Sequence, residues 1–429
     1  MSTFFGVLRT NPNYRYTWIG QVVSEIGDHF NNIAVFSLAL AHTESGLVVT
    51  GIMLSRAIPA ILAGPIAGVI LDRYDRRRIM MTSDLLRAVL ALGFIFSLHA
   101  KGNSTLYIFS ALLMFASPFF SSGRSAILPT ITTKEELHIA NSLTQTTQAA
   151  TLTLGTLFAG VAVDQLGFEW AFVFNSLSFV ISAICISRLR VKEGNFRPQR
   201  AALTEADVAR PWHEYREGLY YMRSSPLILG IALLAVGWAT GGGAAQILFS
   251  LFGEIVFHRG AAGIGIIWSF AGVGLLVGGA TAYRLGKRIS FQAYRWVIVA
   301  CYVIHGGAYV VFSQMQSFAW ALFFIALSRA ASAMSSVLNN NQLLRHVDDA
   351  YRGRVFSTIE SMVWATMMLS MMGAGIASQH YSPRTIGVWA GILSSLTAVF
   401  WGWATVTDRL KEPENEVDTD IEIHGEPTI

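Results

Sequence analysis

Long apolar stretches separated by short polar clusters run through almost the whole chain. Each stretch is about 20 residues or longer, the length that a helix needs to cross a bilayer. A membrane β-barrel would instead show alternating segments of about ten residues. The pattern therefore predicts an all-α membrane protein with twelve transmembrane helices, at residues 15–41, 46–71, 79–99, 104–124, 139–163, 169–189, 226–251, 261–283, 292–313, 317–340, 355–379 and 385–407.

One long polar segment, residues 190–225, interrupts these stretches. Its sequence EADVARPWHEYREGLYYMR has the spacing of an amphipathic helix that lies on the membrane surface. The segment separates an N-terminal six-helix lobe, residues 1–189, from a C-terminal six-helix lobe, residues 226–407. Residues 408–429 are acidic and lack an apolar pattern, so we expect a disordered tail.

Composition agrees with a membrane protein and argues against other classes. Of the 429 residues, 53% are hydrophobic and only 14% are charged, whereas a soluble domain carries roughly 25% charged residues. The two cysteines, Cys185 and Cys301, form no C-x-x-C pair, and no His, Cys and carboxylate cluster has metal-ligand spacing. No Walker sequence or catalytic constellation is visible in the sequence. We expect no enzymatic activity, no cofactor and no metal.

The basic residues predict which side of the membrane each loop faces. Most Lys and Arg residues lie in the N-terminal segment, the loop DRYDRRR, the loop containing Arg124 and Lys134, residues 190–225, the loops RLGKR and RHVDDAYRGR, and the C-terminal segment. The loops on the opposite side contain only Lys101, Arg259 and Arg384. The positive-inside rule therefore predicts that both termini are cytoplasmic. It also explains the basic residues without a nucleic-acid partner.

The two halves share a loop pattern that indicates an internal repeat. The segment GVILDRYDRR runs from Gly68 to Arg77, and GATAYRLGKR runs from Gly279 to Arg288, 211 residues later. Both fit G-x-x-x-[DY]-R-x-x-[RK]-R, and both occupy the loop after the second span of their half. Parallel six-helix repeats of this kind are one of the known transporter architectures.

The first of these loops carries a resemblance to a known family. GPIAGVILDRYDRRRIM resembles the loop motif G-x-x-x-D-R-x-G-R-[RK] of the major facilitator superfamily, with Asp75 in place of the middle Gly. That variant, together with GQVVSEIGDHFNNIA, AIPAILAGPIAG, FSSGRSAILPTI, EYREGLYYMRSSP and RHVDDAYRGRVFS, resembles the bacterial branch of macrolide and siderophore exporters. The resemblance implies a twelve-helix, two-lobed exporter driven by an ion gradient. Antiporters of the superfamily usually have Gly-Pro in the fifth span, where this chain has Gly155-Thr156.

Two acids lie near the middle of the first span. Gln21, Glu25, Asp28 and Asn32 fall within about 60° of one another around a helix and form one polar stripe. The acids lie roughly 15–20 Å from the cytoplasmic end, and Arg56 reaches a similar depth in the second span. One interpretation is that Arg56 neutralises one carboxylate and the surplus acid exchanges protons, with Asp28 the stronger candidate. The alternative is that both acids only hold helices together.

A second set of charges lies toward the cytoplasmic side. Asp84 and Arg87 have the i, i+3 spacing of an ion pair on one helix face. We expect them to join the loop motif in a gate whose arginines meet acids of the other lobe, although the positive-inside rule alone would also explain an Arg-rich loop. The predicted gate comprises Gly68, Asp72, Arg73, Arg76, Arg77, Asp84, Arg87 and Glu360.

Other polar side chains within the spans are candidates to line a substrate cavity between the lobes. Arg329 could bind an anionic or polar substrate group, or a backbone carbonyl or carboxylate of its own chain. Amides in membrane helices often only join neighbouring helices. The candidates are Gln21, Asn32, Gln145, Gln148, Gln246, Arg329, Asn339 and Asn340.

Together these features predict a monomeric secondary transporter of the inner (plasma) membrane that works by alternating access. We expect it to export an amphipathic small molecule, such as a drug, a macrolide or a siderophore, driven by protons or another coupling ion. A lipid or lysolipid flippase of the same fold is an alternative. A receptor or scaffold that does not transport is another, and it would not need a surplus acid at the midplane.

Overall fold

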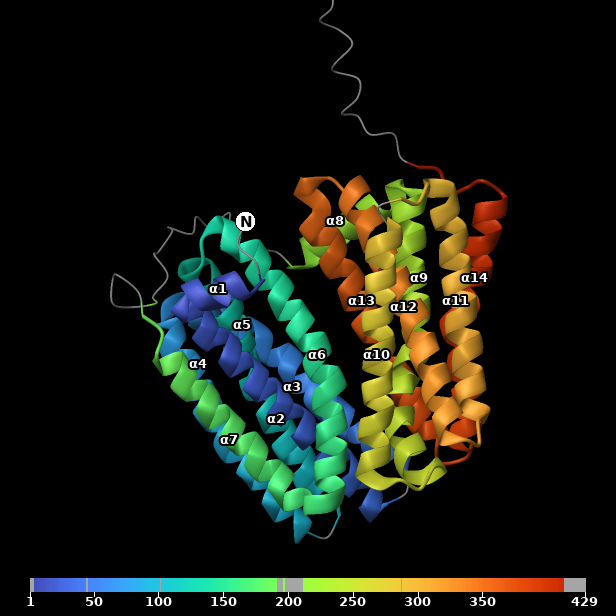
Figure 1. Ribbon diagram of the computed structural model, residues 1–429. Helices are drawn as coiled ribbons and strands as arrows, with labels where there is room; N and C mark the ends of the chain where they lie inside the picture. The colour runs from blue at the N-terminus through green and yellow to red at the C-terminus, as the bar shows by residue number, and fades with distance from the viewer. Residues whose placement is uncertain are drawn as a thin grey trace, which may run out of the picture.

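The computed structural model describes residues 4–43, 45–100, 102–190, 196, 211–286 and 288–412, and these form helices joined by short loops, without a strand (Figure 1). The helices are α1 (Phe4–Thr10), α2 (Pro12–His42), α3 (Gly46–Arg73), α4 (Arg76–Gly93), η1 (Phe94–Leu98), α5 (Ser104–Ile131), α6 (Lys134–Leu166), α7 (Phe168–Ser187), α8 (Pro211–Ser224), α9 (Pro226–Leu251), η3 (Phe252–Val256), α10 (Gly260–Gly286), α11 (Phe291–Gln314), α12 (Phe318–His346), α13 (Asp349–Ala377) and α14 (Pro383–Val406).

Polar caps mark where several helices begin. Thr133 and Glu136 form a capping box at the start of α6, in which each side chain binds the backbone N–H of the other. Asn11 and Ser225 accept hydrogen bonds from backbone N–H groups of α2 and α9, and a proline follows each of them. These residues satisfy the first N–H groups of each helix, which fixes the ends of apolar segments whose composition alone would leave them undefined.

Eleven helices in the described part of the chain are long and apolar enough to span a membrane. They correspond to eleven of the twelve predicted spans. The remaining one, residues 15–41, is the 31-residue helix α2, whose polar stripe and charges lower its mean hydropathy below that of a clear span. The count of twelve transmembrane helices therefore stays a prediction.

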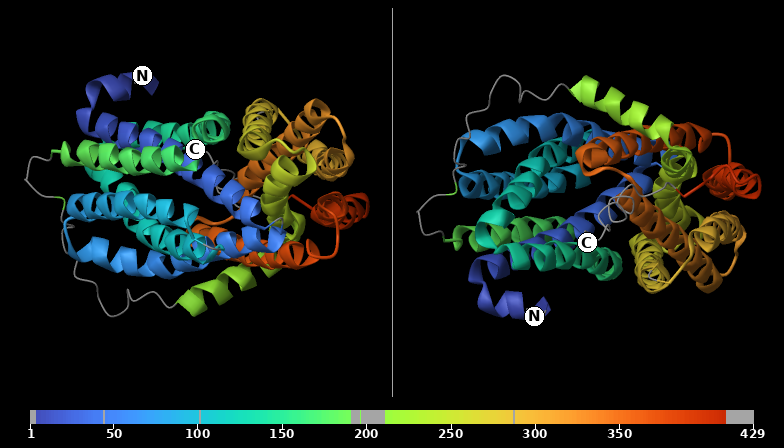
Figure 2. Two further views of the ribbon diagram at one scale, coloured as in Figure 1. Left: turned by 90° about the horizontal axis from the view of Figure 1, so that it is seen from below. Right: turned by 90° about the horizontal axis from the view of Figure 1, so that it is seen from above.

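The helices form two lobes. Helices α1 to α7 lie in one lobe and α9 to α14 in the other, and the two groups lie side by side when viewed from either end (Figure 2). They converge at one end and separate toward the end that carries α1 and α8 (Figure 1). Helix α8 packs on α13, where Tyr221 donates a hydrogen bond to Asp348 (3.0 Å) and Glu217 pairs with Arg354 (2.8 Å).

The contact between the lobes is tightest where α6 meets α10. A Cβ atom at Gly265 would lie 2.3 Å from the backbone oxygen of Thr156, and one at Gly160 would lie 2.8 Å from the backbone oxygen of Ala261. Glycine allows the two backbones to approach this closely. On the other side of the interface, α3 meets α13, where the Thr50 hydroxyl donates to the backbone oxygen of Met371 (3.2 Å).

A third contact joins the same end of the lobes. Ser37 of α2 donates a hydrogen bond to Glu254 of η3 (2.9 Å). All three contacts involve the halves of these helices that lie away from α1 and α8. The lobes are thus joined at one end and separate at the other.

Two predicted segments lie largely outside the described residues. Within residues 190–225 the structure has the helix α8, whereas residues 191–195 and 197–210 lie outside the described part. The expected disordered tail begins at residue 408, and residues 413–429 are outside the described part, so that expectation is untested. Before that point, Arg295 donates a hydrogen bond to Asp408 (2.7 Å), and this bond and the guanidinium charge lower the pKa of Asp408 from its usual value.

Candidate functional site: a cavity between two lobes

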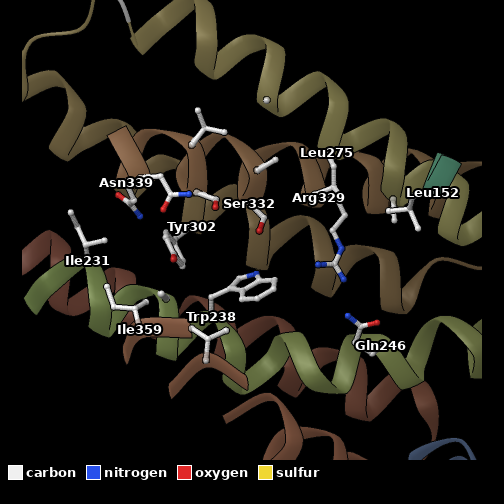
Figure 3. A pocket seen from close by; sticks show the side chains of 18 of the residues that line it. Leu152, Ile231, Trp238, Gln246, Leu275, Tyr302, Arg329, Ser332, Asn339 and Ile359 are labelled. Atoms are coloured by element: carbon white, nitrogen blue, oxygen red, sulfur yellow. The ribbon is translucent and has the colours of Figure 1, made fainter. Parts of the chain in front are cut away.

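A cavity of about 570 Å³ lies on the face of the C-terminal lobe that is turned toward the other lobe (Figure 3). Helices α9, α10 and α12 supply most of its wall, and Leu152 of α6 reaches it from the N-terminal lobe. Drug-sized ligands occupy sites of about 300–1,000 Å³. Its aromatic and polar lining consists of Trp238, Gln246, Phe249, Trp268, Tyr302, Arg329, Ser332, Ser336, Asn339 and Asn340.

A smaller cavity of about 260 Å³ adjoins it between the lobes. The two share Leu152, Gln246 and Trp268. The smaller cavity is lined on the N-terminal side by His29 and Asn32 of α2, Phe36 of α2, Arg56 of α3 and Thr156 of α6. Both lobes therefore contribute polar side chains to one continuous region.

The predicted cavity residues divide into two groups. Gln246, Arg329, Asn339 and Asn340 line the larger cavity, and Asn32 and Arg56 line the smaller one. Gln21 lines a separate space of about 180 Å³ in the N-terminal lobe. Gln145 and Gln148 are exposed on α6 and line none of these three cavities.

Sequence analysis missed the aromatic side chains of the site. Trp238, Phe249, Trp268 and His29 lie in apolar or weakly polar segments, where nothing distinguishes a cavity-lining ring from a lipid-facing or packed one. Only the arrangement of helices around a shared space separates these cases. The periodicity of apolar and polar residues shows which side chains share one face of a helix, but not whether that face contacts lipid, another helix or a cavity.

Glu25 has three polar partners. It accepts hydrogen bonds from Gln21 (2.8 Å) and Thr151 (2.8 Å), and its carboxylate lies 3.8 Å from the guanidinium of Arg124. The cation beside Glu25 is therefore Arg124. Arg56 instead interacts electrostatically with the other carboxylate, that of Asp28. Helix α5 continues seven residues past the predicted end of the fourth span, which brings Arg124 inside the lobe rather than into a loop.

Asp28 differs from Glu25 in its surroundings. It is half-buried, and no side chain or backbone group in the described part of the chain makes a hydrogen bond with it. Arg87 of α4 and Arg56 of α3 are the cations that interact with it electrostatically, and Glu25 and Asp84 are the acids. Arg56 in turn lies 6.0 Å from the ring centroid of Phe36 and faces the smaller cavity.

Asp84 and Arg87 form the predicted ion pair, and both are buried inside the lobe. The Arg87 guanidinium lies over the rings of Phe120 (4.7 Å) and Phe179 (4.3 Å). Three acids in the middle of this lobe are thus matched by Arg56, Arg87 and Arg124. Among the described residues the number of acids equals the number of arginines, because Arg124, which the sequence analysis placed in a cytoplasmic loop, lies beside Glu25.

Breaking the Asp84–Arg87 pair is expected to destabilise the protein strongly. Asp84→Leu leaves a buried guanidinium without its partner, and the expected loss is about 3–5 kcal/mol of unfolding free energy. Asp84→Leu combined with Arg87→Leu should recover much of that loss. The measurement is denaturant unfolding of the purified protein. Asp72→Asn is the control, because the ion pair of Asp72 with Arg76 is long (3.8 Å) and exposed and should contribute little stability. Equal stability of the Asp84 and Asp72 variants would contradict this account.

The loop motif bonds within its own lobe. Arg76 donates to the backbone oxygen of Ala126 (2.8 Å), and Arg77 donates to that of Ser187. Asp75, which replaces the family glycine, caps α4 by accepting from the backbone N–H of Arg78 (3.0 Å). Arg73 and Glu360, which belong to the predicted gate, are exposed. Gly68 has open space beside it, because a Cβ atom there would meet nothing within 4 Å. Among the described residues, none of these arginines pairs with an acid of the other lobe.

A helical membrane protein with two lobes and a polar cavity between them has the organisation of a secondary transporter. Residues 17–365 match the model of the Major Facilitator Superfamily, and the chain belongs to that family. It is therefore a multi-pass membrane transporter rather than an enzyme.

Several bacterial transporters resemble the chain over most of its length and support its assignment to this family. The chain is 24% identical to the "Putative bacilysin exporter BacE" of Bacillus subtilis, over 86% of this chain and 89% of that protein. It is 25% identical to the "Multidrug efflux pump Tap" of Mycolicibacterium fortuitum, over 81% and 85% of the two chains. It is 21% identical to "Macrolide efflux protein A" of Streptococcus pyogenes, over 83% and 86%.

Solved structures show the same fold. A bacterial homologue of the iron transporter ferroportin, in an inward-facing state, superposes with a TM-score of 0.68 at 18% identity, covering 91% of this chain and 98% of that one. A bacterial homologue of the human lysosomal transporter Spinster, inward-facing and unoccupied, gives 0.69 at 14% identity, covering 94% and 99%.

Proposed function

We propose that this protein exports an amphipathic small molecule across the bacterial plasma membrane, driven by protons that enter as the substrate leaves. Twelve transmembrane helices, cytoplasmic termini and a monomeric state belong to the proposal. Three relatives whose names describe export or efflux support its direction. The basic residues of the loops support its orientation, because they gather on the side of α1 and α8.

The observation that carries the proposal is the shared cavity between lobes whose described contacts lie at one end and in the middle of the helices, while the other ends are separated. With the termini in the cytoplasm, the contacts at Gly160–Gly265, Thr50–Met371 and Ser37–Glu254 close the outer side. The separated ends then face the cytoplasm, and the loop-motif arginines bond within their own lobe. Rocking of the lobes would open the first set of contacts and bring the loop motif toward α13, exposing the cavity to the outside.

Asp28 is the proposed proton-coupling residue. Its carboxylate has no hydrogen-bond partner among the described residues, so nearby cations, chiefly Arg87 and Arg56, stabilise its charge. Protonation would weaken its attraction for Arg56, which lines the smaller cavity and lies on α3 six residues from the interlobe contact at Thr50. One proton moving inward supplies roughly 2.3 kcal/mol per 100 mV, enough for about a fiftyfold substrate gradient.

Transport into inside-out vesicles tests the proposal. Purified protein is reconstituted, a proton gradient and membrane potential are imposed, and accumulation of dansylglycine and of a radiolabelled macrolide is followed. We expect accumulation of at least one probe that collapses when a protonophore is added. Uptake unaffected by the protonophore would contradict proton coupling. Competition by lysophospholipid, with no uptake of either probe, would favour the flippase alternative, and binding without any transport would favour a receptor.

A further inference from the structure

The larger cavity contains a buried cation whose partner is missing. Arg329 of α12 is only 8% exposed, and its guanidinium points across the cavity toward Gln246 of α9 (Figure 3). It lies 5.0 Å from the ring centroid of Phe249. In the described residues, neither a hydrogen bond nor an ion pair joins Arg329 to another group, although Tyr309 interacts with it electrostatically.

The acids of the C-terminal lobe are placed elsewhere. Glu254 accepts a hydrogen bond from Ser37 at the closed end, and Glu217 pairs with Arg354 at the other end. Glu360 is exposed in the middle part of α13 and does not line the larger cavity. The buried charges of the N-terminal lobe balance one another, as described above. Among the described residues no acid lines either cavity, so the charge of Arg329 is not compensated there.

A neighbouring histidine does not offset this charge. His305 of α11 is buried and lies within hydrogen-bonding distance of the Ser328 hydroxyl (2.9 Å) and backbone oxygen (3.1 Å). Imidazole is neutral or positive in any protonation state, so it cannot balance a guanidinium. Its bonds hold α11 against α12 and position the helix that carries Arg329.

A second donor in the same cavity also lacks a partner. The indole nitrogen of Trp238 is buried and, in the described part of the structure, makes no hydrogen bond. Trp238 and Arg329 both face the space shown in Figure 3, and Gln246 lies opposite Arg329. A buried cation and a buried N–H donor without acceptors are costly unless a ligand supplies the acceptors.

We propose that the transported molecule is an aromatic or apolar compound carrying one anionic group, a carboxylate or a sulfonate, that pairs with Arg329. Guanidinium groups bind such anions through charge-assisted, often bidentate hydrogen bonds. The Trp238 indole and the Gln246 amide donate further hydrogen bonds, and Trp268 and Phe249 pack on the apolar part. This inference rests on the proposed export function and defines the substrate class of the same cavity.

Binding of a matched probe pair tests the substrate class. Dansylglycine carries a carboxylate, and dansylglycinamide has the same ring and a neutral amide. Affinities are measured in nanodiscs at neutral pH by energy transfer from tryptophan, with no ion gradient present. We expect the wild type to bind dansylglycine about tenfold more tightly or better, as a charge-assisted contact would give. Equal affinities, or no saturable binding of dansylglycine, would overturn the inference.

Variants locate the effect at Arg329. Arg329→Gln should make the two affinities roughly equal, whereas Arg329→Lys should keep a preference for the anion. Gln246→Glu places a carboxylate opposite Arg329 and should weaken dansylglycine binding while leaving the fold intact. Arg384→Gln is the matched control, because Arg384 bonds to the backbone oxygens of Ser313 (3.1 Å) and Met315 (2.9 Å), away from the cavity. A preference that survives in Arg329→Gln would contradict the assignment.

The binding test and the transport test can give opposite outcomes, so failure of the substrate class can be distinguished from failure of the proposed function. The binding test uses no gradient, so loss of proton coupling would leave the preference for the anion unchanged. Gradient-driven export of neutral probes without any preference for anions would instead overturn the substrate class and leave the proposed function standing.

Discussion

Asp28→Asn is expected to reduce gradient-driven accumulation in vesicles to the level reached without a gradient. Asparagine keeps the size of the side chain but cannot take up and release a proton. One coupled proton supports a ratio of probe concentration inside to outside the vesicles of roughly fifty per 100 mV. In Asp28→Asn this steady-state ratio should fall to about one. Two measurements are compared for each protein. The first is uptake of the transported probe under an imposed gradient, and the second is exchange of labelled for unlabelled probe across the vesicle membrane without a gradient.

Exchange separates lost coupling from lost folding. An Asp28→Asn protein that rocks without a proton should still exchange labelled for unlabelled probe. Glu25→Gln is the matched control, since Glu25 lies one turn away on the same helix, accepts hydrogen bonds from Gln21 and Thr151, and forms an ion pair with Arg124. We expect that variant to lose stability but to retain gradient dependence. If Asp28→Asn accumulates probe as the wild type does, Asp28 is not the coupling residue.

Gly265→Ala is expected to open the outer contact between the lobes. The new Cβ would lie 2.3 Å from the backbone oxygen of Thr156, so α6 and α10 must move apart. Overpacking of this kind costs about 1–3 kcal/mol, which would raise the population of the open arrangement by roughly 5- to 150-fold. A cysteine introduced at Ala261, buried beside this contact, should then react faster with a thiol reagent.

The same helix provides the control. A Cβ at Gly279 of α10 would meet nothing within 4 Å, so Gly279→Ala changes helix propensity without changing the contact. The two native cysteines are buried and give little background labelling. Equal labelling rates in the Gly265 and Gly279 variants would show that the close approach of α6 and α10 does not control access from the outside.

The sequence alone predicted much of the helical architecture. Apolar stretches of membrane length recovered eleven spans, and most of their predicted ends lie within about three residues of the observed helix ends. The larger differences are at the ends of α5 and α12 and at the starts of α6 and α13. The repeated loop pattern from Gly68 and from Gly279 indicated two similar halves. These features are local, since they depend on the order of residues in one segment and on the hydrocarbon thickness that each segment must cross.

Which residues pair with the charged side chains could not be predicted from the sequence and became clear only from the tertiary structure. Arg124 and Glu25 are 99 residues apart in sequence, and only the packing of α5 against α2 brings them together. Arg329 shows the converse: it has no hydrogen-bond or ion-pair partner among the described residues, because the described acids of its lobe do not line its cavity.

By itself, then, the sequence determined which segments are helical, which lie in the membrane and that ionisable groups occur at its middle. The tertiary structure decided which of those groups are neutralised, which face the cavity and which end of the lobes is closed. The physical reason is that hydrophobicity acts on each segment separately, whereas compensation of a buried charge depends on distances of a few ångströms between helices.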